Sequence, residues 1–322
     1  MGDEKSVLPA NRPPEVGYKT KLGTIYVGEV ERFLESDPGR HLRGKVQLIL
    51  TSPPFPLNRK KRYGNEQGEE FMKWLAGLAK PLTRLLAPDG SIVMEMGNGW
   101  EPGQPVMSTL SLRSLLSFLE DGELHLCQQF VCHNPARLPS PAQWVNVERI
   151  RVKDAYTNVW WMSPSERPKA SNRNVLTEYS GAMRDLLRKQ RYNAGTRPSG
   201  HNIGKTSFLK DNGGAIPSNV LTFSNTASSD PYRDYCRQKH LDVHPALMAP
   251  GLAEFFIRML TDERDLVYDP FAGSNTTGAV AEALGRRWVG TEPIPWYVAG
   301  SKGRFEELSE PKAGGAQLRM AG

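Results

Sequence analysis

The segment Leu48-Ile49-Leu50-Thr51-Ser52-Pro53-Pro54-Phe55 organises the rest of the chain. Its first three residues end an apolar run over 46–50, which predicts a short buried strand. The two prolines cannot continue a hydrogen-bonded ladder, so the strand must end just before them. In an open α/β sheet, ligands bind at the carboxyl ends of the strands. The turn therefore presents a hydroxyl (Ser52), a carbonyl (Pro53) and an aromatic ring (Phe55) where a planar ring with an amino group can be held.

A second pattern near the end of the sequence predicts a nucleotide site. A strand over 266–268 runs into Asp269-Pro270-Phe271-Ala272-Gly273-Ser274-Asn275-Thr276-Thr277-Gly278, and a helix over 279–284 and a strand over 287–290 follow. Strand, glycine-bearing turn, helix and strand form a nucleotide-binding βαβ unit. Glu292, after the second strand, is placed to accept hydrogen bonds from two ribose hydroxyls. The turn lacks the central glycine of a dinucleotide motif, which argues against a nicotinamide dinucleotide. It also lacks the lysine of a phosphate loop, which argues against ATP hydrolysis.

Both motifs resemble those of the DNA amino-methyltransferases. Ser-Pro-Pro-Phe resembles their catalytic motif in its cytosine-N4 form, and the ten residues from Asp269 resemble their S-adenosylmethionine loop. The catalytic motif comes first and the cofactor loop last, which is the order of the permuted β class. The resemblance is closest to the PvuII-type cytosine-N4 enzymes of restriction–modification systems. It extends over most of 18–305, including 154–161, 210–217 and 255–261.

This resemblance implies a fold and a reaction. The fold is the α/β methyltransferase fold, a Rossmann-like mixed sheet flanked by helices, in which the strand over 46–51 and the strand over 266–269 are neighbours. The reaction transfers a methyl group from S-adenosylmethionine to N4 of a cytosine flipped out of double-stranded DNA. The resemblance also suggests a companion restriction endonuclease for the same target site. The oligomeric state stays open.

The resemblance assigns roles to residues at both motifs and after the first strand. The catalytic residues it implies are Ser52, Pro53, Pro54 and Phe55. The cofactor-binding residues it implies are Asp269, Phe271, Ala272, Gly273, Ser274, Asn275, Thr276, Glu292 and Glu29. The last of these stands where the family commonly has Asp, and it is equally well explained as a solvated glutamate favoured at a helix N-terminus.

Two basic segments are candidates for DNA contacts. The first follows the catalytic motif and carries Arg59, Lys60, Lys61 and Arg62; the second carries Arg197, Ser199, His201, Asn202 and Lys205. Cations beside glycines and amides suit contacts to phosphates and base edges. The alternative for each is a solvated surface loop without a role.

The chain divides by composition into three parts. We expect a catalytic part over 18–163, a target-recognition region over 164–243 that is rich in Arg, Lys, Asn, Ser and Gly, and a cofactor-binding part over 244–305. Loose tails are expected over 1–17 and 306–322. Further strands are expected over 24–28, 91–96, 124–131 and 156–162, with helices over 29–34, 71–86, 110–119, 176–191 and 252–260.

The bulk properties agree with a nucleic-acid enzyme of the cytoplasm. The 322 residues carry a net charge of +6, a mild basic bias consistent with a polyanionic partner. Three cysteines, Cys127, Cys132 and Cys236, make no disulfide framework and, with His133, no zinc-ligand spacing, so we expect no metal. We expect no signal peptide and no membrane span.

Several alternatives remain open on the sequence alone. The first is an adenine-N6 methyltransferase on the same fold, which the serine at position 52 argues against. The second is a non-catalytic nucleic-acid-binding protein with a vestigial cofactor site. An RNA substrate is disfavoured because no RNA-binding module is recognisable. The tetrapeptide by itself could also be a plain Pro-Pro turn that closes a strand.

Overall fold

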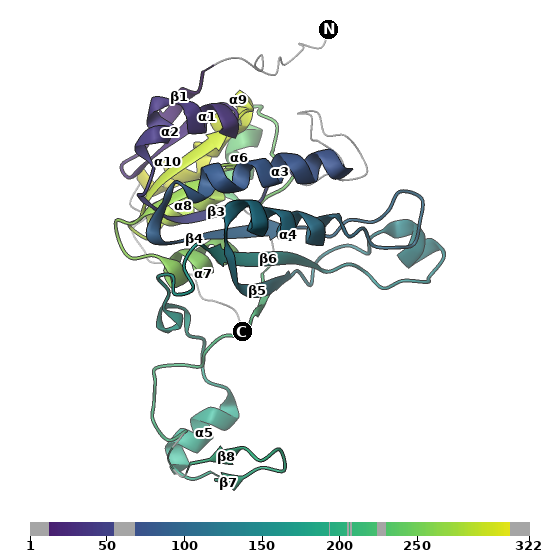
Figure 1. The fold of residues 1–322 in the computed structure, drawn as a ribbon, viewed down its shortest axis with the longest axis vertical. Helices are drawn as coiled ribbons and strands as arrows, with labels where there is room; N and C mark the ends of the chain where they lie inside the picture. The colour runs from purple at the N-terminus through teal and green to yellow at the C-terminus, as the bar shows by residue number, and fades with distance from the viewer. Residues whose placement is uncertain are drawn as a thin grey trace.

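A mixed β-sheet forms the centre of the molecule (Figure 1). The computed structural model describes residues 13–54, 68–192, 194–204, 206, 208–223 and 230–309. Within them, nine strands are ordered β1-β2-β11-β10-β3-β4-β6-β5-β9. Their bounds are Glu15–Lys19 (β1), Gly23–Val27 (β2), Val46–Thr51 (β3), Leu86–Met96 (β4), His125–His133 (β5), Tyr156–Ser163 (β6), Val220–Thr222 (β9), Leu266–Asp269 (β10) and Arg287–Glu292 (β11).

The two motif-bearing strands lie side by side in this sheet. β10 pairs with β3 in parallel, Tyr268 opposite Ile49, so the expected neighbourhood of these strands is confirmed. β2, β11, β10, β3 and β4 are mutually parallel, and β6 is inserted antiparallel between β4 and β5. β9 runs parallel to β5. The carboxyl ends of seven strands, β2, β11, β10, β3, β4, β5 and β9, therefore meet at one edge of the sheet.

Helices cover both faces of the sheet. The α-helices within the described ranges are Val30–Glu35 (α1), Asp37–His41 (α2), Gly68–Thr83 (α3), Leu110–Gly122 (α4), Gly181–Lys189 (α5), Pro231–Gln238 (α6), Pro250–Leu260 (α7), Thr276–Ala283 (α8), Pro295–Ser301 (α9) and Gly303–Ser309 (α10). α1, α3 and α4 pack on one face and α7 and α8 on the other (Figure 1).

The buried side chains of β3 explain these two layers. All six of its residues are buried. Val46 and Ile49 belong to the apolar cluster under α3 and α4, whereas Leu48 and Leu50 belong to the cluster under α7 and α8. A strand that is apolar on both faces is typical of a parallel sheet covered on both sides.

Several element boundaries differ from the sequence prediction. α3 ends at Thr83, and β4 already begins at Leu86, because the carbonyl of Leu85 accepts hydrogen bonds from the amides of Lys45 and Val46. The expected helix over 176–191 is shortened to α5. Its first turn is fixed by Ser180, whose hydroxyl accepts a hydrogen bond from the Met183 amide. An N-cap of this kind sets where a helix starts.

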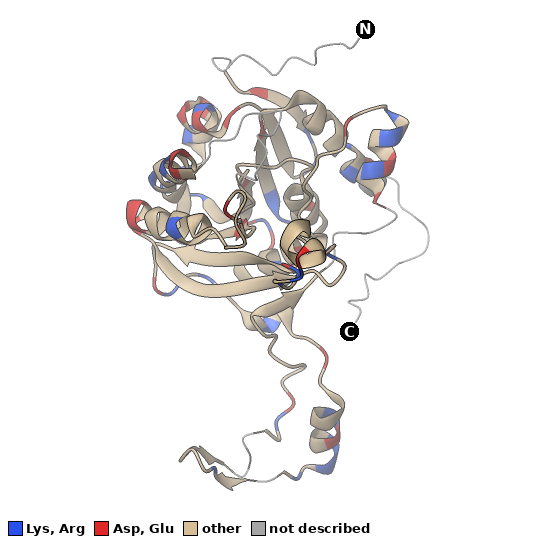
Figure 2. Ribbon diagram, turned by 90° about the vertical axis from the view of Figure 1, so that its right-hand side faces the viewer, with Lys and Arg blue, Asp and Glu red and all other residues tan. Residues whose placement is uncertain are grey.

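The region expected to read the target is divided in two by the structure. Its middle, with α5 and the hairpin of β7 (Gly195–Thr196) and β8 (Asn202–Ile203), forms an arm that projects away from the body in both Figure 1 and Figure 2. Its ends belong to the body instead. β9 pairs with β5 at the sheet edge, and α6 packs against α10.

The expected loose tails are shorter than predicted. Residues from Glu15 form β1, which pairs antiparallel with β2, and α10 continues to Ser309. The Tyr18 hydroxyl shares a hydrogen bond of 2.7 Å with Ser301, at the end of α9. Contacts of this long range, across 283 residues, have no local sequence pattern. The rest of both tails lies outside the described residues.

Candidate active site

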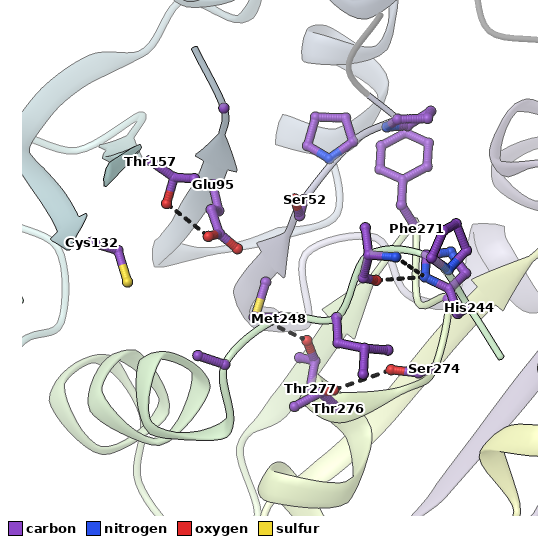
Figure 3. Close-up of a pocket in the computed structure, with 18 of the residues that line it drawn as sticks. Ser52, Glu95, Cys132, Thr157, His244, Met248, Phe271, Ser274, Thr276 and Thr277 are labelled. Atoms are coloured by element: carbon purple, nitrogen blue, oxygen red, sulfur yellow. Dashed lines mark hydrogen bonds between the residues drawn. The ribbon is translucent and has the colours of Figure 1, made fainter. Parts of the chain in front are cut away.

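A cleft of about 620 Å³ opens at the carboxyl edge of the sheet. It is lined by the end of β3, the ends of β4 and β5, the segment before α7, and the turn between β10 and α8. In Figure 3, Ser52 lies between two groups of side chains, with Glu95, Thr157 and Cys132 on one side and the cofactor-loop residues on the other. The two sequence motifs therefore face one cleft.

The catalytic motif contributes three described residues to this cleft. Ser52, Pro53 and Pro54 all line it. Ser52 is exposed, whereas Pro53 is buried and fixes the backbone directly after β3. Phe55 lies outside the described residues. The hydroxyl and the carbonyl that the sequence singled out are thus in place at the mouth of the strand.

One carboxylate joins the two motifs. Asp269, at the end of β10, accepts hydrogen bonds from the Thr51 hydroxyl at 2.8 Å and the Thr277 hydroxyl at 2.7 Å. It also accepts one from the amide of Phe271 at 3.0 Å. Burial raises the pKa of Asp269 to about 6, and these three hydrogen bonds counteract part of that rise. Asp269 therefore fixes the turn as well as lining the cleft.

The turn after β10 is shaped by a close approach to a histidine. Gly273 has φ of +51°, and a side chain there would meet the ring of His244 at 3.0 Å. Asn275, with φ of +56°, is fully buried, and its side chain accepts from the Gly278 amide and donates to the Tyr18 hydroxyl. Ser274 and Thr276 line the cleft, but Asn275 supports the turn from beneath it.

Glu292, the last residue of β11, lies beside this turn. Its carboxylate accepts hydrogen bonds of 3.0 Å from the amides of Gly273 and Ile294. Burial raises the pKa of Glu292 to about 7, despite these two hydrogen bonds, which favour the charged form. Each oxygen uses one lone pair on the backbone, and a carboxylate offers about four acceptor sites. Glu292 can therefore still accept hydrogen bonds from a pair of ligand hydroxyls.

A partly buried arginine holds the cofactor turn from the side opposite the cleft. Arg304, on α10, donates from Nε to the Ser274 carbonyl at 2.7 Å and from Nη2 to the Ser274 hydroxyl at 3.1 Å. Its guanidinium also lies 3.4 Å from Asp230 and 4.9 Å from the ring centre of Tyr232. The Tyr232 hydroxyl in turn accepts from the His244 amide at 2.8 Å. Arg304 thus connects α10 and α6 to the turn.

Glu95 is a cleft residue that the sequence interpretation missed. It is the next residue after Met94, which pairs with Thr51 across β3 and β4, so Glu95 and Ser52 continue neighbouring strands. Its carboxylate accepts a hydrogen bond of 2.8 Å from the Thr157 hydroxyl. Burial raises the pKa of Glu95 above the ordinary value. A carboxylate at the end of a predicted strand was the signal that could have identified it.

Glu29 lies near the cofactor side but outside the cleft lining. It precedes α1 at the carboxyl end of β2, the strand next to β11, and it is exposed. It makes no side-chain capping hydrogen bond to α1. Burial nevertheless raises its pKa. Its proposed contact with the cofactor stays a prediction.

The candidate DNA residues fall into two groups. Arg59, Lys60, Lys61, Arg62 and Lys205 lie outside the described residues. Arg197, Ser199, His201 and Asn202 are exposed at the tip of the β7–β8 hairpin, where Arg197 and His201 are joined by a backbone hydrogen bond of 2.8 Å. The hairpin belongs to the projecting arm (Figure 2), so these side chains are separate from the cleft.

The comparison with family models shows which family this chain belongs to. The model described as "DNA methylase" matches residues 46–302, a span that includes both motifs and the cleft between them. The chain belongs to this DNA methylase family. It accordingly acts on DNA as a methylase.

Individual DNA methylases agree with this assignment. The chain is 44% identical over 299 residues to the type II methyltransferase M.PvuII of Proteus hauseri, covering 92% of this chain and 88% of the relative. It is 25% identical to M.BglII of Bacillus subtilis, covering 92% and 72%. The solved structure of "PvuII DNA methyltransferase (cytosine-N4-specific)" matches with a TM-score of 0.72 and 37% identity, covering 92% and 90%.

A more distant solved structure shares the fold. The crystal structure of the M1.HpyAVI–SAM complex matches with a TM-score of 0.51 and 19% identity, covering 88% of this chain and 99% of that one. The α/β methyltransferase fold expected from the sequence is thereby confirmed. Among the described residues, none forms a cluster suited to hold a metal ion, and no helix is long and apolar enough to cross a membrane.

Proposed function

We propose that this DNA methylase transfers a methyl group from S-adenosylmethionine to the exocyclic N4 of a cytosine flipped out of double-stranded DNA. The observation that carries the proposal is the meeting of Ser52-Pro53-Pro54 and the Asp269–Thr277 turn in one cleft, joined by the hydrogen bond from Thr51 to Asp269. The 44% identity to a relative whose solved structure is titled cytosine-N4-specific supports the choice of base.

The residues of the turn fit the cofactor. Glu292 offers acceptor sites to the two ribose hydroxyls, and the amino end of α8, with the hydroxyls of Ser274 and Thr276, suits an amino-acid carboxylate. Phe271 and Met248 supply apolar surface in the same wall. When bound, S-adenosylmethionine supplies a methyl carbon made electrophilic by its sulfonium.

The catalytic corner activates the amino group. Cytosine N4 is a poor nucleophile because its lone pair is delocalised into the ring. Ser52 Oγ and the Pro53 carbonyl accept hydrogen bonds from its two N–H groups, which favours a tetrahedral nitrogen and localises the lone pair. Much of the acceleration comes from alignment, which can supply about 7–11 kcal/mol. Phe55 stacks on the flipped ring in this proposal, a contact worth about 1–3 kcal/mol.

Glu95 removes the proton that the methylated nitrogen must lose. The methyl carbon would leave the sulfonium sulfur, which would keep the bonding electrons as a neutral thioether. The new N–C bond would leave a positive charge on N4, and loss of one N–H proton restores the neutral amine. Glu95, beside Ser52 and held by Thr157, is the carboxylate at this end of the cleft. Its raised pKa makes it a stronger base than an exposed glutamate.

The exposed arm contacts the duplex around the target cytosine. Arg197, Ser199, His201 and Asn202 stand at its tip, and the basic segment with Arg59 to Arg62 follows the catalytic corner in sequence. Cations and amides of this kind bind phosphates and base edges. A restriction endonuclease that cuts the same target site is the partner in function, and methylation protects the host DNA from it.

Mass analysis of nucleosides tests the proposal directly. DNA from cells that express the chain is digested to nucleosides, and N4-methylcytosine is expected above the level in cells without it. N6-methyladenine without N4-methylcytosine would replace the proposal by the adenine alternative. If neither product is found and calorimetry detects no binding of S-adenosylmethionine, the chain is a non-catalytic protein with a vestigial cofactor site. Mapping the modified position in the same DNA yields the target sequence.

A further inference from the structure

The connection between β5 and β6, residues 134–155, borders the active-site cleft and is here named the β5–β6 loop. Five of its residues line the cleft: Asn134, Ala136, Arg137, Leu138 and Ser140. In Figure 1 this connection extends beyond the ends of both strands, away from the sheet. No motif in the sequence assigns it a role, and the proposed chemistry uses none of its residues.

The β5–β6 loop exposes an unusual amount of apolar surface. The exposed fraction is 80% for Leu138, 68% for Val147, 47% for Ile150 and 86% for Val152. Exposed apolar groups gathered on one segment mark an interaction site more often than scattered ones do. Leu138 is the member of this group that also lines the cleft, so it stands at the cleft mouth.

Internal hydrogen bonds hold the loop in this exposed position. The Asp154 amide donates to the Ser140 carbonyl at 3.0 Å, which closes the base of the loop. The Ile150 amide donates to the Trp144 carbonyl at 2.9 Å, and the Arg151 guanidinium reaches the Pro105 carbonyl of a neighbouring segment at 3.0 Å. The apolar side chains are therefore presented on an ordered support, which reduces the entropy lost on binding.

The charges of the loop identify the chemistry of its partner. It carries four cations (Arg137, Arg149, Arg151 and Lys153) and two acids (Glu148 and Asp154), a net charge of +2 from 4 − 2. Within the described part of the chain, none of the four cations lies within 4.0 Å of a carboxylate. Arg137, Arg151 and Lys153 donate to backbone carbonyls, which orient a cation without neutralising it. Arg137 also interacts with the Glu95 carboxylate and lowers its pKa. Arg149, Arg151 and Lys153 suit a polyanion.

We infer that the β5–β6 loop is a DNA wedge: its cations bind the phosphates around the target, and Leu138 enters the duplex where the cytosine has left. This inference rests on the proposed function and adds a binding surface to it. Extruding a base costs a few kcal/mol of lost stacking, and an inserted apolar side chain restores part of the lost contact. Leu138, exposed beside the cleft that receives the base, is positioned for that contact.

A duplex that needs no help in extrusion tests the wedge. Leu138→Ala is assayed in single turnover on a matched duplex and on one with an abasic site opposite the target cytosine, both carrying the mapped target sequence. On the matched duplex we expect a loss of at least about tenfold, equivalent to one apolar contact, and on the abasic duplex a loss below about twofold. The matched control is Leu126→Ala, which removes a leucine exposed to 42% on β5 and leaves both rates unchanged.

Salt dependence tests the cations independently. For Arg149→Gln we expect the slope of log Kd against log salt to fall by about 0.9, the value for one lost phosphate contact. The control is Arg43→Gln, an exposed cation just before β3 at the opposite edge of the sheet, for which the slope stays unchanged. An unchanged slope in Arg149→Gln would remove the phosphate contact from the inference.

The outcomes separate this inference from the proposed function. Wild-type protein that methylates neither duplex contradicts the proposed function itself. Methylation by the wild type, with Leu138→Ala equal to it on the matched duplex, overturns only the wedge. Equal losses on both duplexes also overturn it, because they assign Leu138 to the cleft geometry. A change of oligomeric state in the Leu138 variant would show that the apolar group contacts a second copy instead.

Discussion

The Thr51 hydroxyl donates a hydrogen bond of 2.8 Å to the Asp269 carboxylate across 218 residues of sequence. Thr51 is the last residue of β3, immediately before Ser52, and Asp269 is the last of β10, immediately before the cofactor turn. This one contact sets the distance between the corner that activates the amino group and the turn that holds the methyl donor. Both of its partners are buried.

Replacing this hydroxyl by a methyl group should weaken both the fold and the catalysis. Thr51→Val keeps the volume but leaves Asp269 with one hydrogen bond fewer in a buried site. We expect the free energy of unfolding in urea to fall by about 1–3 kcal/mol. Thr83→Val is the control, because that hydroxyl bonds only the Ala79 carbonyl of its own helix and its loss should change stability by less than about 0.5 kcal/mol. If the free energy of unfolding falls equally in the two variants, the hydrogen bond to Asp269 contributes no more to stability than the one within the helix.

Removing the serine hydroxyl should slow the chemical step without loosening the cofactor. Ser52→Ala deletes one of two acceptors for the amino hydrogens but leaves the turn after β10 intact. We expect the single-turnover rate to fall by about 10- to 100-fold, equivalent to one hydrogen bond to a reacting group. Calorimetry should give the same Kd for S-adenosylmethionine as the wild type. A variant that methylates at the wild-type rate would exclude Ser52 from the mechanism.

Much of this arrangement followed from local sequence patterns. β3 and β10 could be predicted because each is a short apolar run that ends in a turn signal, and their adjacency followed from the permuted motif order. The cleft positions of Ser52 and Gly273 followed for the same reason. Arg304 could not be predicted, because its partners Ser274 and Asp230 lie 30 and 74 residues away and no local pattern marks them.

The target-recognition region shows a different limit. Its composition predicted a separate unit over 164–243, yet β9 joins the main sheet and α6 packs on α10. Composition reports solvent exposure averaged over a segment, and the short buried stretches around Leu221 and Cys236 are lost in that average. Asn275 illustrates the same point at one residue. The motif includes it with the cofactor loop, whereas burial turns its side chain beneath the turn.

Cofactor binding should depend on pH through Glu292. Burial raises its pKa to about 7, so the free protein carries a protonated Glu292 below that pH and a carboxylate above it. Only the carboxylate accepts hydrogen bonds from both ribose hydroxyls on its free sites. We expect S-adenosylmethionine to bind more tightly as pH rises, with about a tenfold loss one pH unit below the pKa. Glu292→Gln should bind weakly with a flatter pH dependence; an equally steep one would assign the titration to another group.

The same raised pKa predicts the opposite trend for stability. An unfolded glutamate ionises near its ordinary pKa of about 4.5, whereas the folded protein holds the proton until about pH 7. Between these values the native state binds more protons than the unfolded state, so the contribution of Glu292 to the free energy of unfolding falls as pH rises. Urea unfolding of wild type and Glu292→Gln at pH 5 and pH 8 measures this contribution. If the difference in free energy of unfolding between wild type and Glu292→Gln is the same at both pH values, the pKa of Glu292 is not raised.

Arg304 should govern cofactor affinity rather than the chemical step. Arg304→Met removes two hydrogen bonds to Ser274 and the ion pair with Asp230. We expect KM for S-adenosylmethionine to rise by about tenfold or more, since hydrogen bonds to charged groups contribute about 1.5–3 kcal/mol each, while kcat changes much less. Arg304→Lys keeps the charge and should recover part of the affinity. Equal effects on kcat and KM in both variants would indicate a general loss of structure.

Glu95 should control how the rate depends on pH. In the proposed reaction it accepts the proton that N4 loses, so it must be ionised, and the rate should rise with pH through its raised pKa. Glu95→Gln keeps the size and can still accept the Thr157 hydrogen bond of 2.8 Å through its amide oxygen, but it cannot take a proton. We expect a loss of about 10²–10⁴-fold in the single-turnover rate, with the low-pH limb of the profile abolished. Thr157→Val tests the hydrogen bond that holds Glu95, because it deletes the hydroxyl and leaves the carboxylate. The pH–rate profile of this variant should shift to higher pH, and its single-turnover rate should fall less than that of Glu95→Gln. A Glu95→Gln variant that keeps the limb would mean that water takes the proton and that Glu95 acts only as a wall of the cleft.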